Sequence, residues 1–78
     1  DTITVLPITS KTKEVYPFEV LLLKEDSSLP YDSKIKCNQI RTIDKKRLVK
    51  LLGVVSDKKI AEIERALLIH LGIRDTLS

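Results

Sequence analysis

The sequence predicts a small, mainly β domain that ends in a single α-helix. Short stretches of alternating or branched apolar residues occupy positions 2–55 and are separated by polar loops, a pattern typical of strands. Residues 57–71 instead carry apolar side chains at spacings of three and four, which is typical of a helix with one buried face. The chain has 78 residues, so we expect one domain with a thin hydrophobic core.

The first two strands are expected at residues 2–8 and 15–23. Branched apolar residues alternate with threonine in the first, and Pro7 falls where its missing N–H leaves no ladder hydrogen bond unmade. A polar loop over residues 9–13 follows. The second stretch is so apolar that its end should be buried on both faces.

A third strand is expected over residues 33–43, with an irregularity in its middle. Ile35 and Cys37 would face the core. The residues expected to point outward are polar: Lys34, Lys36 and Asn38. The alternation slips after Asn38, which indicates a bulge or a sharp bend.

A fourth strand is expected over residues 48–55, and the C-terminal helix over residues 57–71. Ser56 is a suitable N-cap because its hydroxyl can accept a hydrogen bond from a first-turn amide, and Gly72 provides a C-terminal stop. The helix also carries apolar residues outside its main stripe. This wide apolar arc fits either contact with a partner subunit or deep burial in the helix's own domain.

Several classes of protein and site are not expected from the composition. Cys37 is the single cysteine, so no internal disulfide forms and a reducing compartment, the cytoplasm, is expected. No apolar run approaches the roughly 18 residues of a membrane helix. We expect no metal and no cofactor, because metal-ligand spacings and a glycine-rich phosphate loop do not occur, and His70 suits a structural role at the helix end.

Positive charge is concentrated in one part of the chain. Seven bases and one acid lie between Lys34 and Lys50, while the net charge of the whole chain is +3. Such a block is a candidate phosphate-binding surface, and the alternative is a solvated face. Arg41 is the strongest candidate within it, since a guanidinium donates two parallel hydrogen bonds to a phosphate. A structural bridge from Arg41 to Asp44 or to a loop carbonyl is the alternative.

Further polar side chains are expected at the ends of the first and third strands. If these strands are neighbours in a small barrel, their polar groups would gather on one rim. The residues concerned are Thr9, Ser10, Asn38, Gln39, Arg41 and Thr42.

Three stretches of the sequence resemble one known family. Residues 32–48 read DSKIKCNQIRTIDKKRL, residues 61–73 read AEIERALLIHLGI, and residues 5–11 read VLPITSK, similar to the family's central strand that ends in Thr-Ser. Together they resemble the C-terminal two-thirds of a MazF/PemK-like toxin, an mRNA interferase of a type II toxin–antitoxin system. The QIRTID core is fairly specific at this distance from the other two stretches.

The resemblance implies an SH3-like β-barrel whose N-terminal strands are missing from this chain. It also implies a homodimer, a cognate antitoxin peptide as partner, and metal-independent cleavage of single-stranded RNA. In that reaction the ribose 2′-OH attacks the adjacent phosphate and leaves a cyclic phosphate and a 5′-OH; DNA has no such nucleophile. The alternative is a truncated, non-catalytic module that binds RNA or the antitoxin or forms oligomers, because the family's G-x-x-R-P loop, with a principal catalytic arginine, is not in this sequence.

Position by position, the resemblance implies that Thr9 and Arg41 are catalytic. Lys36 stands where some members have an arginine, and Asn38 where several have an acidic residue. An amide cannot act as a general base, so a mechanism that needs a carboxylate at Asn38 is not open to this chain. The residues implied to bind RNA are Ser10, Lys11, Lys36, Asn38, Gln39, Thr42, Lys45, Lys46 and Arg47.

Overall fold

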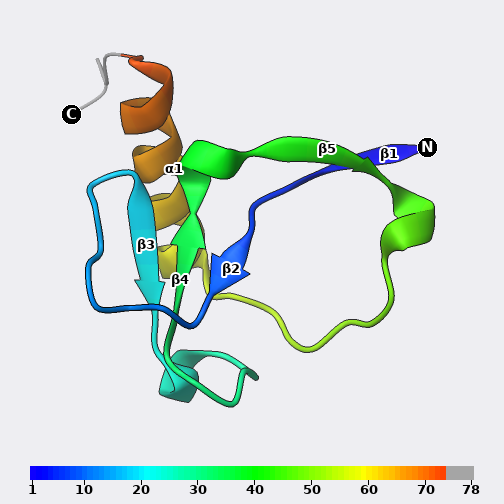
Figure 1. Cartoon of the computed structure of the whole chain (residues 1–78), viewed down its shortest axis with the longest axis horizontal. Helices are drawn as coiled ribbons and strands as arrows, with labels where there is room; N and C mark the ends of the chain where they lie inside the picture. The colour runs from blue at the N-terminus through cyan, green and yellow to red at the C-terminus, as the bar shows by residue number, and fades with distance from the viewer. Residues whose placement is uncertain (74–78) are drawn as a thin grey trace.

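A computed structural model describes residues 1–73, in which five short strands form two antiparallel sheets (Figure 1). In the three-stranded sheet, β4 (Ser33–Lys36) lies between β2 (Ile8–Thr9) and β3 (Glu19–Leu22). In the two-stranded sheet, β1 (Thr2–Val5) pairs with β5 (Arg41–Asp44). With one α-helix after these strands, the described chain is mainly β with a C-terminal helix, as the sequence predicts.

The hydrophobic core lies between the three-stranded sheet and α1 (Asp57–Leu71). Val20 and Ile35 are register partners, so their side chains share the face of the sheet that packs on Ala66 of α1. The five buried apolar residues are Val20, Leu22, Ile35, Cys37 and Ala66, each exposing 5% or less of its surface. The inward orientation predicted for Ile35 and Cys37 is therefore confirmed.

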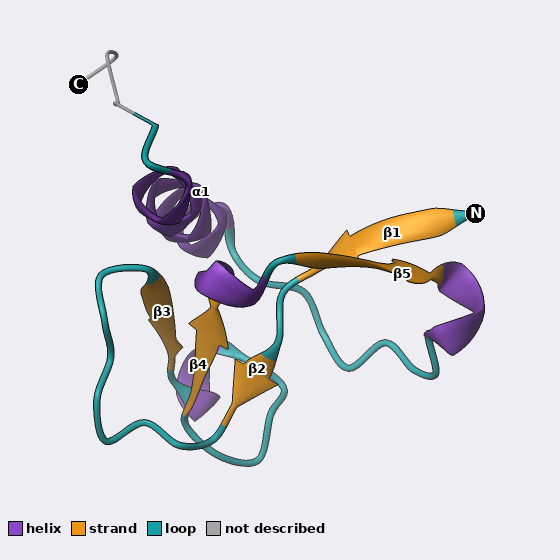
Figure 2. Cartoon of the chain, turned by 45° about the horizontal axis from the view of Figure 1, so that its top comes forward, coloured by secondary structure: helices purple, strands orange, loops and turns teal. Residues whose placement is uncertain are grey.

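The two-stranded sheet extends away from α1 as a ribbon (Figure 2). A 3₁₀ turn, η2 (Cys37–Gln39), joins β4 to β5 and forms the bend that the sequence predicts near Asn38. The Cys37 thiol lies 3.9 Å from the carbonyl oxygen of Ile63 in α1, so the start of this bend is packed against the helix. A second 3₁₀ turn, η3 (Lys45–Arg47), follows β5 at the far end of the ribbon.

Three of the predicted strands are shorter than expected. The first, over residues 2–8, is divided near Pro7 into β1 and β2, which belong to different sheets, and the third, over residues 33–43, is divided by η2. Only the end of the stretch at 15–23 becomes the strand β3. The residues before β3 do not pair in the sheet. They end in a turn in which the Glu19 amide donates to the Tyr16 carbonyl.

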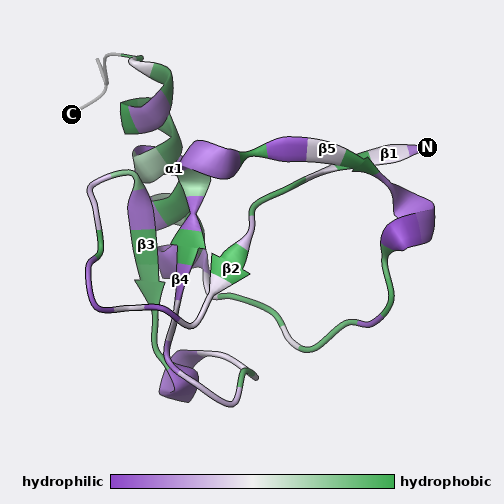
Figure 3. Ribbon diagram, in the orientation of Figure 1, coloured by the Kyte–Doolittle hydropathy of each residue, from purple (hydrophilic) through white to green (hydrophobic). Residues whose placement is uncertain are grey.

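The strand predicted over residues 48–55 is not formed. The side chains of Val49, Leu51 and Val54 expose 96%, 83% and 86% of their surface, and Figure 3 shows the segment as a hydrophobic loop. Apolar composition suits a strand, but a strand also needs a neighbouring backbone for its hydrogen bonds. Within residues 1–73 no strand pairs with this segment.

The later part of this segment packs against a loop that precedes β4. A Cβ atom at Gly53 would lie 2.4 Å from the Ser28 hydroxyl oxygen, so a larger residue there would displace the Ser28 side chain. Beside it is a hollow of about 220 Å³, and apolar side chains that line it include Ile8, Leu22 and Val55.

The helix has the bounds that the sequence predicts. Ser56 Oγ accepts a hydrogen bond from the Lys59 amide at 3.2 Å, and Gly72 is left-handed with φ of 70°. Ile69 and Leu71 expose 52% and 56% of their surface, so deep burial of the whole apolar arc is not observed in the described chain. None of the helices within residues 1–73 is long and apolar enough to cross a membrane.

Replacing Ser56 by alanine should lower the free energy of unfolding by about 1 kcal/mol, because the Lys59 amide loses its hydrogen-bond acceptor. Urea unfolding followed by circular dichroism measures the change. Ser56→Asn is the matched control, since asparagine caps a helix as well as serine does. Equal losses in both variants would contradict the capping role.

Candidate functional site

The face of the three-stranded sheet opposite the core brings two of the predicted site residues together. Thr9 pairs with Lys34 and Lys36 pairs with Glu19, so these four side chains share one face. Thr9 is opposite Lys34, which lies two positions before Lys36 in β4, and two positions of strand span about 7 Å. Both residues are half-buried.

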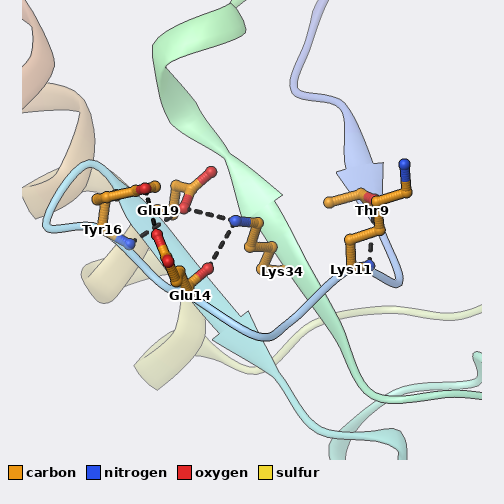
Figure 4. Close-up of polar contacts among 6 residues, drawn as sticks. All are labelled: Thr9, Lys11, Glu14, Tyr16, Glu19 and Lys34. Carbon is orange, nitrogen blue, oxygen red and sulfur yellow. Dashed lines mark hydrogen bonds and ion pairs between the residues drawn. The ribbon is translucent and has the colours of Figure 1, made fainter.

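Thr9 is held in position by the turn that follows β2. Its Oγ1 accepts a hydrogen bond from the Lys11 amide at 3.2 Å, as threonine side chains do in tight turns (Figure 4). This contact uses an oxygen lone pair, so the hydroxyl proton remains available to a ligand. Ser10 and Lys11, which complete the turn, are exposed.

Lys34 is not on the solvent-facing surface that the alternation predicts for it. It does point away from the core, but its ammonium donates to Glu19 Oε1 at 2.9 Å and only 8% of the residue is exposed. The segment before β3 lies over this face, since the Glu14 carbonyl also accepts from Lys34 Nζ at 2.6 Å. The signal for this pair is Glu19 itself, a charged residue between Phe18 and Val20 in an apolar stretch.

The electrostatics of this pair set the protonation of Glu19. Burial raises the pKa of the Glu19 carboxyl, but the hydrogen bond from the Tyr16 amide and the Lys34 ammonium together hold its pKa below the usual 4.5. Glu19 is therefore ionised at neutral pH and compensates the charge of Lys34.

The pKa of the Cys37 thiol is shifted in the opposite direction from that of Glu19. Burial, with a smaller effect of the Glu19 charge, raises the pKa of the Cys37 thiol above its usual 9.0. The thiol stays protonated and suits the structural role that its complete burial indicates.

Arg41 lies outside the three-stranded sheet, at the start of β5. It pairs in register with Val5 and its side chain is exposed. Asp44 Oδ1 instead accepts a hydrogen bond from the Lys46 amide at 2.9 Å and caps η3. Throughout residues 1–73 no ion pair joins Arg41 to Asp44, so the structural bridge considered from the sequence is not formed.

Thr9 and Arg41 belong to different sheets. Thr9 is opposite Lys34, whereas Arg41 is opposite Val5, which precedes Thr9 by four residues. The bases of η3 are exposed at the other end of β5 and are Lys45, Lys46 and Arg47.

The bend contributes two amides of different exposure. Gln39 is exposed, as is Thr42 in β5. Asn38 is half-buried, and its Oδ1 is a buried oxygen that accepts no hydrogen bond from the described part of the chain. Among residues 1–73 no group of three or more His, Cys, Asp or Glu side chains is arranged to hold a metal ion.

Comparison with known proteins identifies relatives along nearly the whole chain. A family model described as a PemK-like, MazF-like toxin of a type II toxin–antitoxin system matches residues 1–71. The endoribonuclease MazF9 of Mycobacterium tuberculosis is 42% identical over 71 residues, which cover 91% of this chain and 60% of that protein. The chain thus spans less than two-thirds of this curated relative.

Solved structures share the fold. The Mycobacterium tuberculosis toxin MazF-mt6 superposes with a TM-score of 0.85 at 22% identity, over 95% of this chain and 73% of that one. A mycobacterial endoribonuclease in complex with its cognate antitoxin gives a TM-score of 0.80 at 24% identity, over 95% of this chain and 68% of that one.

Acid should destabilise the chain partly through Glu19. A carboxyl with a lowered native pKa contributes stability that is fully present above its unfolded value of 4.5 and is lost as the pH falls through the lower native value. Wild type should therefore lose more free energy of unfolding below pH 4.5 than Glu19→Gln, which does not titrate at this position. Urea unfolding over a pH series measures both, and parallel curves would contradict this role of Glu19.

Proposed function

Because this chain belongs to the family of PemK-like, MazF-like toxins of type II toxin–antitoxin systems, we propose that it acts as a metal-independent endoribonuclease on single-stranded RNA. The observation that carries the proposal is the family match over residues 1–71. The name endoribonuclease, borne by a relative at 42% identity, supports it. The target is RNA because the nucleophile is the ribose 2′-OH.

The proposed reaction forms a bond between the 2′ oxygen and phosphorus and breaks the bond from phosphorus to the 5′ oxygen. A proton leaves the 2′-OH, and another reaches the 5′ oxygen, so the products are a cyclic phosphate and a 5′-OH. Negative charge develops on the phosphorane oxygens and needs fixed donors. Arg41 has an exposed guanidinium without a carboxylate partner in residues 1–73, and it supplies two such donors. The Thr9 hydroxyl supplies another.

RNA would approach these groups along positive charge on the ribbon. The exposed bases from β5 through η3 attract the phosphate backbone, while Lys36 adds charge beside Thr9. Amides and hydroxyls at the bend and turn offer hydrogen bonds to unpaired bases. The proposed RNA-binding residues are Ser10, Lys11, Lys36, Asn38, Gln39, Thr42, Lys45, Lys46 and Arg47.

We further propose that the working protein is a cytoplasmic homodimer of SH3-like barrels that a cognate antitoxin peptide silences. The unpaired apolar segment 48–55, beside a hollow lined by Ile8 and Leu22, is where an added strand would close such a barrel. One structural neighbour of the same fold is an endoribonuclease described in complex with its cognate antitoxin.

A second candidate is a non-catalytic module that binds RNA or the antitoxin. The observation that favours it is Asn38, whose amide cannot act as a base where several family members carry an acid. The two candidates differ in whether bound RNA is cut.

Purified protein incubated with single-stranded RNA in EDTA should release fragments with 5′-OH ends. Arg41→Ala should slow cleavage by about 100-fold or more, since donors to developing charge in other enzymes have effects of that size. Labelling of 5′ ends by a polynucleotide kinase measures the products. Lys58→Ala, an exposed change on α1, is the matched control and should cleave like wild type.

Two outcomes decide between the candidates. RNA that is bound but stays intact contradicts the catalytic proposal and supports the non-catalytic binding module. RNA that is neither bound nor cut at low salt removes both RNA functions from this chain. DNA of the same sequence should stay intact in every case.

Size-exclusion chromatography with light scattering should give a mass of twice 8.9 kDa. A dimer is expected because Leu51, Val54 and Ile69 are exposed apolar side chains that association would cover. A dilution series distinguishes a stable dimer from transient association. A single monomer mass at high concentration would contradict the homodimer.

A further inference from the structure

Lys34 ties the segment between β2 and β3, residues 10–18, to the sheet; we name it the covering segment. The Lys34 ammonium donates to the Glu14 carbonyl at 2.6 Å and to Glu19 Oε1 at 2.9 Å. The Lys34 and Glu19 side chains expose 10% and 3% of their surface. Charges buried to this extent need a partner, so each of the two depends on the other.

The Glu19 carboxylate fastens the covering segment at a second point (Figure 4). Its Oε1 also accepts a hydrogen bond from the Tyr16 amide at 3.0 Å, and the Tyr16 hydroxyl donates to the Glu14 carboxylate. The Tyr16 ring centroid lies 5.6 Å from Lys34 Nζ, within cation–π range. One ion pair thus organises the second half of the segment.

The first half of the covering segment begins directly after Thr9. Since the register places Thr9 opposite Lys34 and the Lys34 ammonium donates to the Glu14 carbonyl, this first half is anchored to Lys34 at both of its ends. One anchor is the backbone pairing of β2 with β4, and the other is the ammonium on Glu14. Ser10 and Lys11 lie between the two anchors.

We propose that Lys34 and Glu19 are positioning residues whose buried ion pair fixes the covering segment and thereby orients Thr9, Ser10 and Lys11 toward RNA. The orientation toward RNA rests on the function proposed above, whereas the fixing of the segment does not. Neither charged group contacts RNA, because both are buried beneath the segment. Buried pairs add little net stability, so their effect here is to select one conformation.

Hydrogen exchange tests the fixing of the segment, with the Tyr16 amide as reporter because it donates to Glu19. Lys34→Met and Glu19→Gln should each speed its exchange by about tenfold or more, as loss of a buried partner does. Amides of α1 should keep their protection. Lys58→Met removes the same charge from an exposed site on α1 and should change neither the exchange of the Tyr16 amide nor the protection of the α1 amides.

A variant that unfolds loses the exchange protection of its α1 amides, and this loss identifies it. If Lys34→Met unfolds, Glu19→Gln decides, because it removes the charge of the pair while it keeps the volume of the Glu19 side chain. Unchanged exchange at Tyr16 in a variant that keeps α1 protected overturns the proposal.

RNA binding over a salt series tests the orientation. Glu19→Gln makes the protein more positive, so charge by itself predicts tighter binding to RNA. The proposal predicts binding about tenfold weaker, since the segment must be ordered on association. Lys34→Met should weaken binding equally without changing the slope of log K against log salt.

The remaining outcomes are distinguishable. A slope reduced by about 0.7 in Lys34→Met would mean that Lys34 contacts a phosphate, and it overturns the positioning role. Tighter binding by Glu19→Gln overturns it as well. A wild-type chain that binds no RNA removes the proposed function and the orientation, and exchange at Tyr16 still decides whether the pair fixes the segment.

Discussion

The structure depends on the two-sided burial of β4. This strand is the only one in the described chain with a neighbour on each edge, and Ser33, Lys34 and Ile35 each expose 8% of their surface or less. Its alternation sends Ile35 into the core and Lys34 onto the opposite face. A register slip by one residue would exchange the two and bury a lysine among Val20 and Leu22. Both the apolar core and the Lys34–Glu19 pair therefore depend on this register.

The division of the fold into two sheets follows from where β4 ends. Cys37 is fully buried against Ile63 of α1, so the chain is anchored there and turns through η2. The residues beyond the turn join a different sheet. As a result, the two proposed catalytic residues, Thr9 and Arg41, come from different sheets. Their relative position is set by the packing of the bend and not by a shared strand.

The sequence predicts those elements whose signals are local. The helix was predicted with its bounds because Ser56, Gly72 and the apolar stripe all act within a few residues of the helix itself. The segment at 48–55 is as apolar as a strand, but its backbone partner is a matter of tertiary structure. Apolar composition therefore predicted a strand there that the described chain does not form.

The site shows the same limit. The bend near Asn38 was predicted from a slip in alternation, which is a local signal. The burial of Lys34 was not predicted, because its partner Glu19 lies 15 residues earlier in the chain and the two residues meet only when β3 and β4 pair. Glu19, a charged residue inside an apolar stretch, was the available sign, and it indicates that a partner is needed without identifying that partner.

The burial of Lys34 also changes how the basic block is understood. Its charge is compensated by Glu19 and is withdrawn from the surface, so the positive field comes from the bases that follow it. Those bases run from Arg41 through η3 along the ribbon, while the Thr9 hydroxyl stands on the other sheet. Most of the positive charge is thus carried by the ribbon together with Arg41, whereas the Thr9 hydroxyl is carried by the three-stranded sheet. Lys36 is the exception, because the β4 register keeps its charge on the face of Thr9.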